Sequence, residues 1–329
     1  MTHHNWRDTN LYGEIKLIAG TACPDLAGLI AKHLSLPLSG RDVTLFPNDN
    51  LFVQLHSSVR GQDVYVIQTT SVPIHRNLME LLIMLQTLRL DSAGRVTAVI
   101  PYLCYARSDK KDRPRVPITA RLVADMIEIA GADRYMTLDL HAGQIQGFFS
   151  IPGDVLTAFH LLTDHIVELL PKMYDPVVVA ADLGFAKKGR NFAAKIDAPI
   201  AFIEKRRYGD DDSPAALSII GDVENHDVII VYDEVVTGSS VAEAVKLVKA
   251  CGARDVYLVF VHPVLAPPAV DTLAALPITQ MITTDTVPIP PEKRKKIEHL
   301  LTVLTIAPLL GEVISRAHSG RSVGELFHE

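Results

Sequence analysis

The chain of 329 residues lacks long apolar runs and has no excess of positive charge. No stretch of about 18 consecutive apolar residues occurs, so the sequence predicts no membrane-spanning helix. The formal net charge of −6 argues against a general nucleic-acid binder, because such proteins need a basic surface to meet the phosphate backbone. A small anionic ligand remains compatible, since it needs only local positive charge.

Cysteine is scarce, with only Cys23, Cys104 and Cys251 in the chain. Their wide spacing forms neither a CxxC zinc pair nor a disulfide framework, which indicates a reducing compartment. The polar start, "MTHHNWRDTN", lacks the apolar core of a signal peptide, and we therefore expect a cytoplasmic protein. Cys104 is either a nucleophile or a small buried apolar residue, and the second interpretation is favoured.

Short β-branched runs alternate with segments of helical periodicity, and hydrophobic residues make up 48% of the chain. This alternation, with continuously apolar strands, predicts an α/β fold with mainly parallel sheets flanked by helices. The predicted strands are 16–19, 64–69, 96–101, 135–140, 176–180, 200–203, 228–232, 256–261 and 280–283. The predicted helices are 24–34, 77–90, 118–130, 155–170, 185–195, 241–250 and 309–318.

The strand–helix pattern occurs twice, with a break at Pro152-Gly153. We therefore predict two similar α/β domains, residues 1–152 and residues 153–329. In such sheets, ligands bind beyond the carboxyl ends of the strands. The polar loops that follow the predicted strands are accordingly the places to look for a site.

One such loop, "DEVVTGSS", follows the predicted strand 228–232. Its Thr237–Ser240 turn offers hydroxyls and backbone N–H groups at the start of a helix, which suits a phosphate. Asp233, just before the turn, suits the hydroxyls of a sugar that carries the phosphate. The alternative is a simple serine cap of the helix.

Two further loops carry candidate metal ligands. Asp139 and His141 fall two residues apart at the end of the predicted strand 135–140, so strand alternation would place them on one side. Asp182 follows the predicted strand 176–180. His141 and Asp182 are either structural or contacts for hydrated Mg²⁺, which prefers few protein ligands together with substrate phosphates.

The segment from Lys205 to Pro214 carries Lys205-Arg206-Arg207 ahead of a polar stretch with Gly and Pro. Cations on such a segment suit a lid that closes over a phosphoryl group and neutralises its charge. An exposed charged hairpin is the competing interpretation.

Five longer stretches are more specific: "SVRGQDVYVIQTT", "NLMELLIML", "SAGRVTAVIPYLCYAR", "RVPITARLVADMI" and "TLDLHAGQIQGFF". With them the chain resembles the ribose-phosphate diphosphokinase family, also called phosphoribosyl pyrophosphate synthetases. The resemblance extends from "KLIAGTACPDLAGLIAKHL" to the terminal "ELFHE". It implies two phosphoribosyltransferase-like domains, a Mg²⁺ requirement and homo-oligomers built from dimers. It also implies transfer of the β,γ-diphosphoryl group of ATP to the C1 hydroxyl of ribose 5-phosphate, with AMP released.

The resemblance also implies roles for individual residues. Lys205 and Arg207 match the catalytic flexible loop of the family, and His141 and Asp182 match contacts to metal and ATP phosphates. Phe46 matches the aromatic residue that holds adenine across a subunit interface. The implied ATP-binding set is Phe46, Asn48, Asn50, Arg107, Ser108, Asp109 and His141, and the implied sugar-phosphate set is Asp182, Asp233, Thr237, Gly238, Ser239 and Ser240.

The chain also departs from the family pattern. Asp49 and Asn50 replace Gly and Glu of the adenine-binding stretch, Ser108 replaces Gln, and Phe185 replaces a Gly after Asp182. In the sugar-phosphate loop, Tyr232 and Val236 stand where the family has Asp. We therefore expect Tyr232 and Val236 to alter the acceptor pocket.

Four functions remain open at this point. The first is diphosphoryl transfer to ribose 5-phosphate, and the second is the same chemistry on another ribosyl phosphate. The third is a non-catalytic regulatory subunit of a phosphoribosyl pyrophosphate synthetase. The fourth, a phosphoribosyltransferase, would need neither the "YARSD" segment nor the lid at 205–207.

Overall fold

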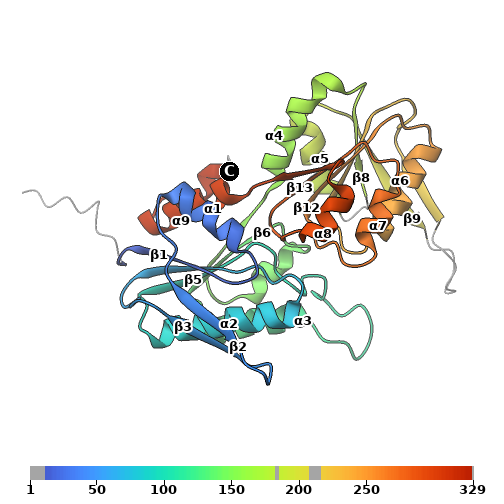
Figure 1. Ribbon diagram of the computed structural model, residues 1–329. Coiled ribbons are helices and arrows are strands. Elements are labelled where there is room, and N and C mark those ends of the chain that lie inside the picture. The colour runs from blue at the N-terminus through green and yellow to red at the C-terminus, as the bar shows by residue number, and fades with distance from the viewer. Residues whose placement is uncertain (1–11, 182–184, 207–215, 328–329) are drawn as a thin grey trace, which may run out of the picture. The chain divides into compact units, whose positions relative to one another are not determined.

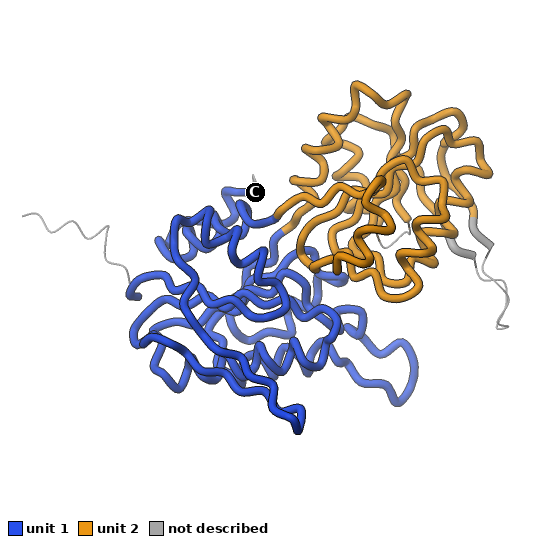
Figure 2. Tube along the Cα trace, viewed as in Figure 1, with its two compact units in different colours: residues 1–156, 306–329 blue, residues 157–305 orange. Residues whose placement is uncertain are grey.

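Buried β-branched strands form two separate sheets, one in each of two units of the chain (Figures 1 and 2). Unit 1 comprises residues 1–156 and 306–329, and unit 2 comprises residues 157–305. The computed structural model describes residues 12–181, 185–206 and 216–327, without the side chains of 205, 206, 216, 217 and 327. The predicted α/β architecture with mainly parallel sheets is confirmed.

Unit 1 contains a parallel five-stranded sheet in the order β1-β4-β5-β6-β7. Strands β2 and β3 form a separate antiparallel hairpin. The strands are β1 (Ile15–Ala19), β2 (Arg41–Leu45), β3 (Leu51–Leu55), β4 (Asp63–Ile67), β5 (Arg95–Ile100), β6 (Arg134–Leu138) and β7 (Gly153–Leu156). The helices are α1 (Pro24–Leu34), α2 (Ile74–Leu90), α3 (Thr119–Ala130) and α9 (Ala307–Ser319), with short 3₁₀ turns η2 (Gly143–Phe148) and η5 (Gly324–Phe327).

Helices cover both faces of this sheet, which explains why its strands are apolar throughout. Figure 1 shows α1 and α9 on one face and α2 and α3 on the other. The apolar stripe of α2 is buried against strand residues such as Val64, Val66 and Val96. A shift of a strand by one residue would exchange its two faces, so the closely packed side chains on both sides would have to repack.

Unit 2 contains a seven-stranded sheet in the order β10-β9-β8-β11-β12-β13-β14. Only the edge pair β9–β10 is antiparallel. The strands are β8 (Val177–Ala180), β9 (Ile200–Arg206), β10 (Ala216–Ile220), β11 (Val228–Glu234), β12 (Val256–His262), β13 (Gln280–Thr284) and β14 (Leu301–Leu304). The helices are α4 (Phe159–Leu169), α5 (Ala186–Lys195), α6 (Ser239–Ala250), α7 (Ala269–Ala274) and α8 (Pro291–Ile297), with the 3₁₀ turn η3 (Leu170–Lys172).

The C-terminal helix α9 packs on α1 and belongs to unit 1. The predicted division at 152/153 assigned this helix to the second domain, and the observed division differs from it. Polar contacts fasten α9 to the sheet: His318 Nδ1 lies 2.8 Å from Asp63 Oδ2, and Arg95 Nη2 donates to the Ala317 carbonyl at 3.1 Å. The chain therefore crosses between the units twice, at 156/157 and at 305/306.

Two element predictions were wrong in their bounds, and some elements, including the hairpin β2–β3, were not predicted. The predicted helix 155–170 starts too early, because Gly153–Leu156 pairs with β6 as strand β7. The hairpin β2–β3 was not predicted, since its exposed residues show no clear apolar alternation. The predicted strand 135–140 ends at Leu138, because Asp139 adopts a φ of 39° that interrupts the extended backbone. Across the described residues, no helix has both the length and the apolar character that a membrane crossing requires.

Candidate functional site

The turn between β11 and α6 has the geometry of a phosphate site. Gly238 precedes the helix with a φ of 78°, a left-handed conformation that glycine adopts without steric cost. The first N–H groups of α6 have no acceptor within the helix, and no side-chain cap occupies them. Thr237, Ser239 and Ser240 are exposed. The turn therefore offers N–H groups and hydroxyls together at the positive end of the helix dipole.

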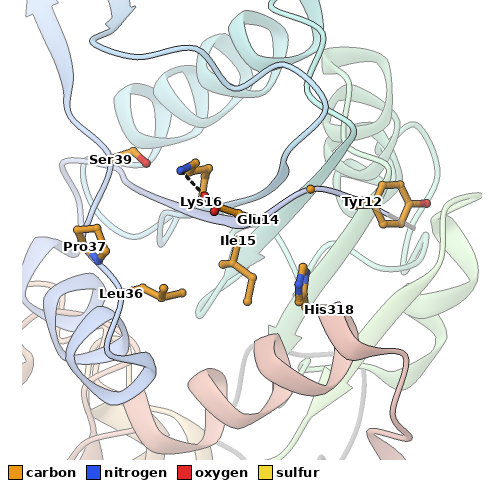
Figure 3. Close-up of a pocket in the computed structure, with 9 residues that line it drawn as sticks. Tyr12, Glu14, Ile15, Lys16, Leu36, Pro37, Ser39 and His318 are labelled. Carbon is orange, nitrogen blue, oxygen red and sulfur yellow. Dashed lines mark hydrogen bonds and ion pairs between the residues drawn. The ribbon is translucent and has the colours of Figure 1, made fainter. Parts of the chain in front are cut away.

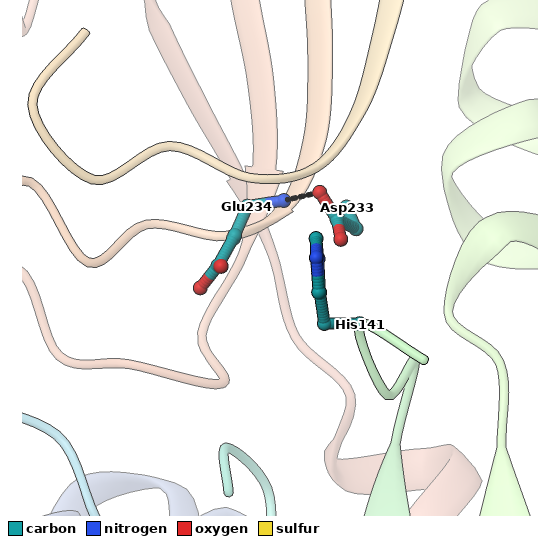
Figure 4. A group of neighbouring side chains, drawn as sticks. All are labelled: His141, Asp233 and Glu234. Carbon is teal, nitrogen blue, oxygen red and sulfur yellow. Dashed lines mark hydrogen bonds between the residues drawn. The ribbon is translucent and has the colours of Figure 1, made fainter. Parts of the chain in front are cut away.

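Asp233 and Glu234 are the last residues of β11, where the sequence predicted a loop. The Glu234 N–H donates to Asp233 Oδ1 at 2.8 Å, which orients the Asp233 carboxylate at the strand end (Figure 4). Asp233 is partly exposed, whereas Glu234 is only 6% exposed. Asp233 is thus the accessible carboxylate beside the phosphate turn.

Tyr232 does not lie where the acceptor-pocket expectation placed it. Its ring is 9% exposed and packs in the apolar core of unit 2. Its hydroxyl donates to the Ser240 carbonyl at 3.0 Å. Tyr232 therefore contacts the turn from the core of unit 2 and not from solvent. A tyrosine with a buried ring usually finds a hydrogen-bond acceptor for its hydroxyl, and here the acceptor is the Ser240 carbonyl. Val236, directly before the turn, is partly exposed.

Three of the predicted ATP-binding residues lie on the β2–β3 hairpin of unit 1. Phe46 is 44% exposed, and its ring centroid lies 6.1 Å from that of Phe52. The Asn50 N–H donates to Asn48 Oδ1 at 3.3 Å, so both residues shape the hairpin turn. Asp49, at the position of a family Gly, has a φ of 65° and keeps the left-handed backbone that glycine favours. The substitution at Asp49 is therefore compatible with the family's turn.

Arg107, Ser108 and Asp109 lie in the loop after β5. Arg107 is exposed, but Ser108 is turned toward α3: its Oγ accepts from the Thr119 N–H at 3.2 Å and donates to Thr119 Oγ1 at 3.2 Å. Ser108 thus satisfies one N–H at the start of α3, as a capping residue does. Asp109 is buried and accepts a hydrogen bond from Gln144.

The residues after β6 are not related by strand alternation, and that prediction was wrong. Asp139 is 4% exposed, whereas His141 is exposed. The positive φ of Asp139 turns the chain at this point, so the two side chains do not share a strand face. His141 remains accessible to a ligand, while Asp139 belongs to the interior of unit 1.

Cys104 is a buried apolar residue and not a nucleophile. It is 0% exposed, and its backbone N–H donates to Thr70 Oγ1 at 2.7 Å. Burial raises the pKa of the Cys104 thiol to about 11. A thiol that stays protonated at neutral pH is a poor nucleophile.

Two pockets of unit 1 contain no residue of the Thr237–Ser240 turn. One, of about 690 Å³, is lined by Tyr12, Ile15, Lys16, Leu36 and His318 among others, and Lys16 pairs with Glu14 at 3.2 Å (Figure 3). It opens at the start of β1, whereas parallel sheets bind ligands at the carboxyl ends of strands. The other, of about 530 Å³, includes Asn50 of the hairpin, together with His75 and Arg76 of α2.

Other predicted residues lie outside the described parts of the chain: Asp182, Arg207 and the side chain of Lys205. The backbone of Lys205 lies in β9, paired with Leu217 of β10. Two hydrogen bonds were not predicted from the sequence: Gln144 donates to the Asp109 carboxylate, and the Tyr232 hydroxyl donates to the Ser240 carbonyl. Gln144 falls inside the quoted "HAGQIQGFF" motif, but only the fold reveals its partner.

Comparison with known proteins gives two family matches. Residues 15–131 match the N-terminal domain of ribose phosphate pyrophosphokinase, and residues 210–328 match the phosphoribosyl synthetase-associated domain. Together the two matches span most of the chain and extend into both units.

Individual relatives are similar to the chain over nearly its whole length. The ribose-phosphate pyrophosphokinase of Deinococcus radiodurans is 42% identical over 94% of this chain and 97% of its own length. The chloroplastic ribose-phosphate pyrophosphokinase 1 of Arabidopsis thaliana is 41% identical over 95% of this chain and 77% of its own length. The crystal structure of phosphoribosylpyrophosphate synthetase from Mycobacterium smegmatis superposes with a TM-score of 0.88, at 40% identity over 93% of this chain and 99% of that one.

Proposed function

Because the chain belongs to the ribose-phosphate pyrophosphokinase family, we propose that it transfers the β,γ-diphosphoryl group of ATP to the C1 hydroxyl of ribose 5-phosphate. The products are phosphoribosyl pyrophosphate and AMP. The observation that carries this proposal most directly is identity above 40% to a curated relative over nearly the full length of both chains.

The phosphate turn Thr237–Ser240 binds the 5-phosphate of the acceptor. Its free N–H groups at the start of α6 and its exposed hydroxyls support this role. The partly exposed carboxylate of Asp233 accepts hydrogen bonds from the sugar hydroxyls. The C1 hydroxyl then attacks the β-phosphorus in line, so the protein contributes mainly positioning and charge neutralisation.

Residues of unit 1 bind ATP. The exposed ring of Phe46 stacks on adenine, with Asn48 and Asn50 nearby on the hairpin. Arg107 and His141 are exposed and contact the phosphates, whereas Ser108 and Asp109 hold the loop through Thr119 and Gln144. Lys205 and Arg207, by their match to the family's catalytic loop, neutralise charge in the transition state.

Mg²⁺ fits the donors that the chain supplies. Mg²⁺ keeps several waters and takes few protein ligands beside substrate phosphates, so an exposed His141 and an acidic Asp182 are sufficient partners. The ion supplies charge neutralisation of the ATP phosphates.

The proposed assembly is a homo-oligomer built from dimers in the cytoplasm. Apolar side chains are exposed on the hairpin and on α2, including Leu45, Phe52 and Met79, and they suit a contact with a second subunit. None of Cys23, Cys104 and Cys251 forms a disulfide within the described residues, which suits a reducing compartment.

An AMP-release assay on the purified chain tests the proposal. The acceptors are ribose 5-phosphate, other ribosyl phosphates and ribose itself, with ATP and Mg²⁺. We expect turnover with ribose 5-phosphate and loss of turnover with EDTA. AMP release with another ribosyl phosphate, but not with ribose 5-phosphate, would favour the same chemistry on that other acceptor. Failure with every acceptor would favour the regulatory-subunit alternative.

A variant pair tests the catalytic loop in the same assay. Lys205→Ala should lower the rate at least about 100-fold, since a charge that acts mainly in the transition state carries that much of the rate. Lys295→Ala, which removes an exposed cation from α8, is the control and should leave the rate unchanged. Equal rates for the two variants would remove Lys205 from the mechanism.

A further inference from the structure

The strand end that precedes the phosphate turn is joined to the turn by a side-chain hydrogen bond. Tyr232 lies in β11, opposite Phe260 of β12, and its ring is buried in the core of unit 2. Its hydroxyl spans to the carbonyl of Ser240, eight residues further along the chain, at 3.0 Å. Ser240 is the second residue of α6.

This hydrogen bond closes the loop that carries the proposed phosphate ligands. Between its two ends lie Thr237, Gly238 and Ser239, and the Thr237 and Ser239 hydroxyls are 3.0 Å apart. A Cβ added to Gly238 would lie at an ordinary van der Waals distance, 3.5 Å, from the Cα and carbonyl oxygen of Ala269, so the turn lies beside α7. The hydrogen bond from Tyr232 joins the turn to β11 on its other side.

A carboxylate at position 232 would not make the same contact. An ionised Asp only accepts hydrogen bonds, and a carbonyl oxygen also only accepts. Tyr, by contrast, donates its O–H and fills the apolar space around it. The hydrogen bond to the Ser240 carbonyl therefore depends on Tyr232, the residue that this chain has where the family has Asp.

We propose that Tyr232 is a positioning residue for the sugar phosphate. Its hydrogen bond to the Ser240 carbonyl fixes the first turn of α6, which carries the phosphate-binding groups. The inference rests on the proposed binding of the acceptor's 5-phosphate at Thr237–Ser240. A phosphate held by several N–H groups needs those groups aligned before it arrives, and a pre-aligned site binds more tightly. Tyr232 acts on acceptor binding and not on the diphosphoryl transfer step.

The test is Tyr232→Phe, which removes only the hydroxyl. Calorimetry measures the Kd of ribose 5-phosphate, and steady-state kinetics measure kcat and both KM values. We expect the Kd and the KM for ribose 5-phosphate to rise about three- to tenfold, the effect of one neutral hydrogen bond. The kcat and the KM for ATP should not change.

Tyr257→Phe is the matched control. Tyr257 is equally buried, at 9% exposure, but lies near the start of β12, opposite Ile229 at the far end of β11 from the turn. It should leave the Kd of ribose 5-phosphate unchanged, so that loss of a tyrosine hydroxyl from the sheet is separated from loss of the hydrogen bond to Ser240.

Each result decides the matter. An unchanged Kd in Tyr232→Phe, an equal rise in Tyr257→Phe, or a fall in kcat with unchanged KM would overturn the inference. A wild-type chain that binds no ribose 5-phosphate would also overturn it. Tight binding without turnover in the wild type, with a weakened Kd in Tyr232→Phe, would sustain the positioning role and contradict the proposed function.

Discussion

At the residue scale, the sugar-phosphate loop keeps one acidic residue and changes its neighbour. Asp233 keeps a partly exposed carboxylate, whereas position 232 has a buried tyrosine ring whose hydroxyl donates to the Ser240 carbonyl. A lost charged hydrogen bond to the sugar would weaken binding by roughly 1.5–3 kcal/mol. A better ordered phosphate turn offsets part of that loss, so the departure at Tyr232 is compatible with an active site.

The cysteines give a prediction at the same scale. Cys23 and Cys104 are buried and Cys251 is exposed. At pH 8 a thiol reagent should therefore modify Cys251 quickly, and the other two only after denaturation. Because the folded pKa of Cys104 is raised to about 11, its contribution to stability is fully present below the ordinary thiol pKa. That contribution is lost as pH rises toward 11.

Cys251→Ser provides the control for this titration. The variant should show no fast-reacting thiol in the native state. One rapid modification in Cys251→Ser would mean that Cys23 or Cys104 is reached by solvent, and would restore Cys104 as a candidate nucleophile.

The turn before α6 was predicted from its hydroxyls and its glycine, but the contacts that support it were not. Gly238 does precede the helix with a positive φ, while phosphate binding at Thr237–Ser240 stays a prediction. The partners of Tyr232 and Asp109 were not predictable, since Ser240 and Gln144 come within reach only once the chain has folded. The pairing of Asp139 with His141 failed because a single positive φ breaks the two-residue period of a strand.

At the element scale, α9 is fastened to β4 and β5 by a buried polar cluster. Asp63 is 0% exposed and accepts from Arg95 Nε at 2.7 Å and from the Tyr65 hydroxyl at 3.0 Å. Burial, followed by the charge of Asp63, raises the pKa of Tyr65 above its ordinary value. The Tyr65 hydroxyl therefore stays protonated as a donor at neutral pH.

Removal of Arg95 should destabilise unit 1 strongly. Arg95→Leu removes the arginine partner of the buried Asp63 carboxylate, and loss of one partner of a buried ion pair typically costs about 3–5 kcal/mol. Arg89→Leu breaks the largely exposed pair of Arg89 and Asp133, which is worth about 1 kcal/mol or less. Urea denaturation followed by circular dichroism measures both variants. Similar losses for Arg95→Leu and Arg89→Leu would contradict the importance of the buried cluster.

The element predictions succeeded where burial was two-sided and failed at edges. The long apolar stripe of α2 was predicted over 77–90 and is observed as Ile74–Leu90. The hairpin β2–β3 has mostly exposed residues and therefore lacks the alternation from which strands are recognised. Strand β7 was absorbed into a predicted helix because its four residues are too few to show a period.

At the scale of the whole molecule, the two units repeat one architecture of a parallel sheet with helices on its faces. The repeat was visible in the sequence as a strand–helix pattern that occurs twice. The return of α9 to unit 1 was not, because its amphipathic stripe fits any apolar surface and its partners, α1 and Asp63, are more than 240 residues away. Long-range packing of this kind is decided by the tertiary structure.

Transfer of an intact diphosphoryl group is the central claim, and γ-labelled ATP tests it most directly. The purified chain is incubated with the labelled nucleotide, Mg²⁺ and ribose 5-phosphate, and the labelled products are separated. We expect the label to appear in phosphoribosyl pyrophosphate, with one AMP formed for each label transferred. Labelled orthophosphate with ADP, or no acceptor-dependent AMP from a folded chain, would contradict it.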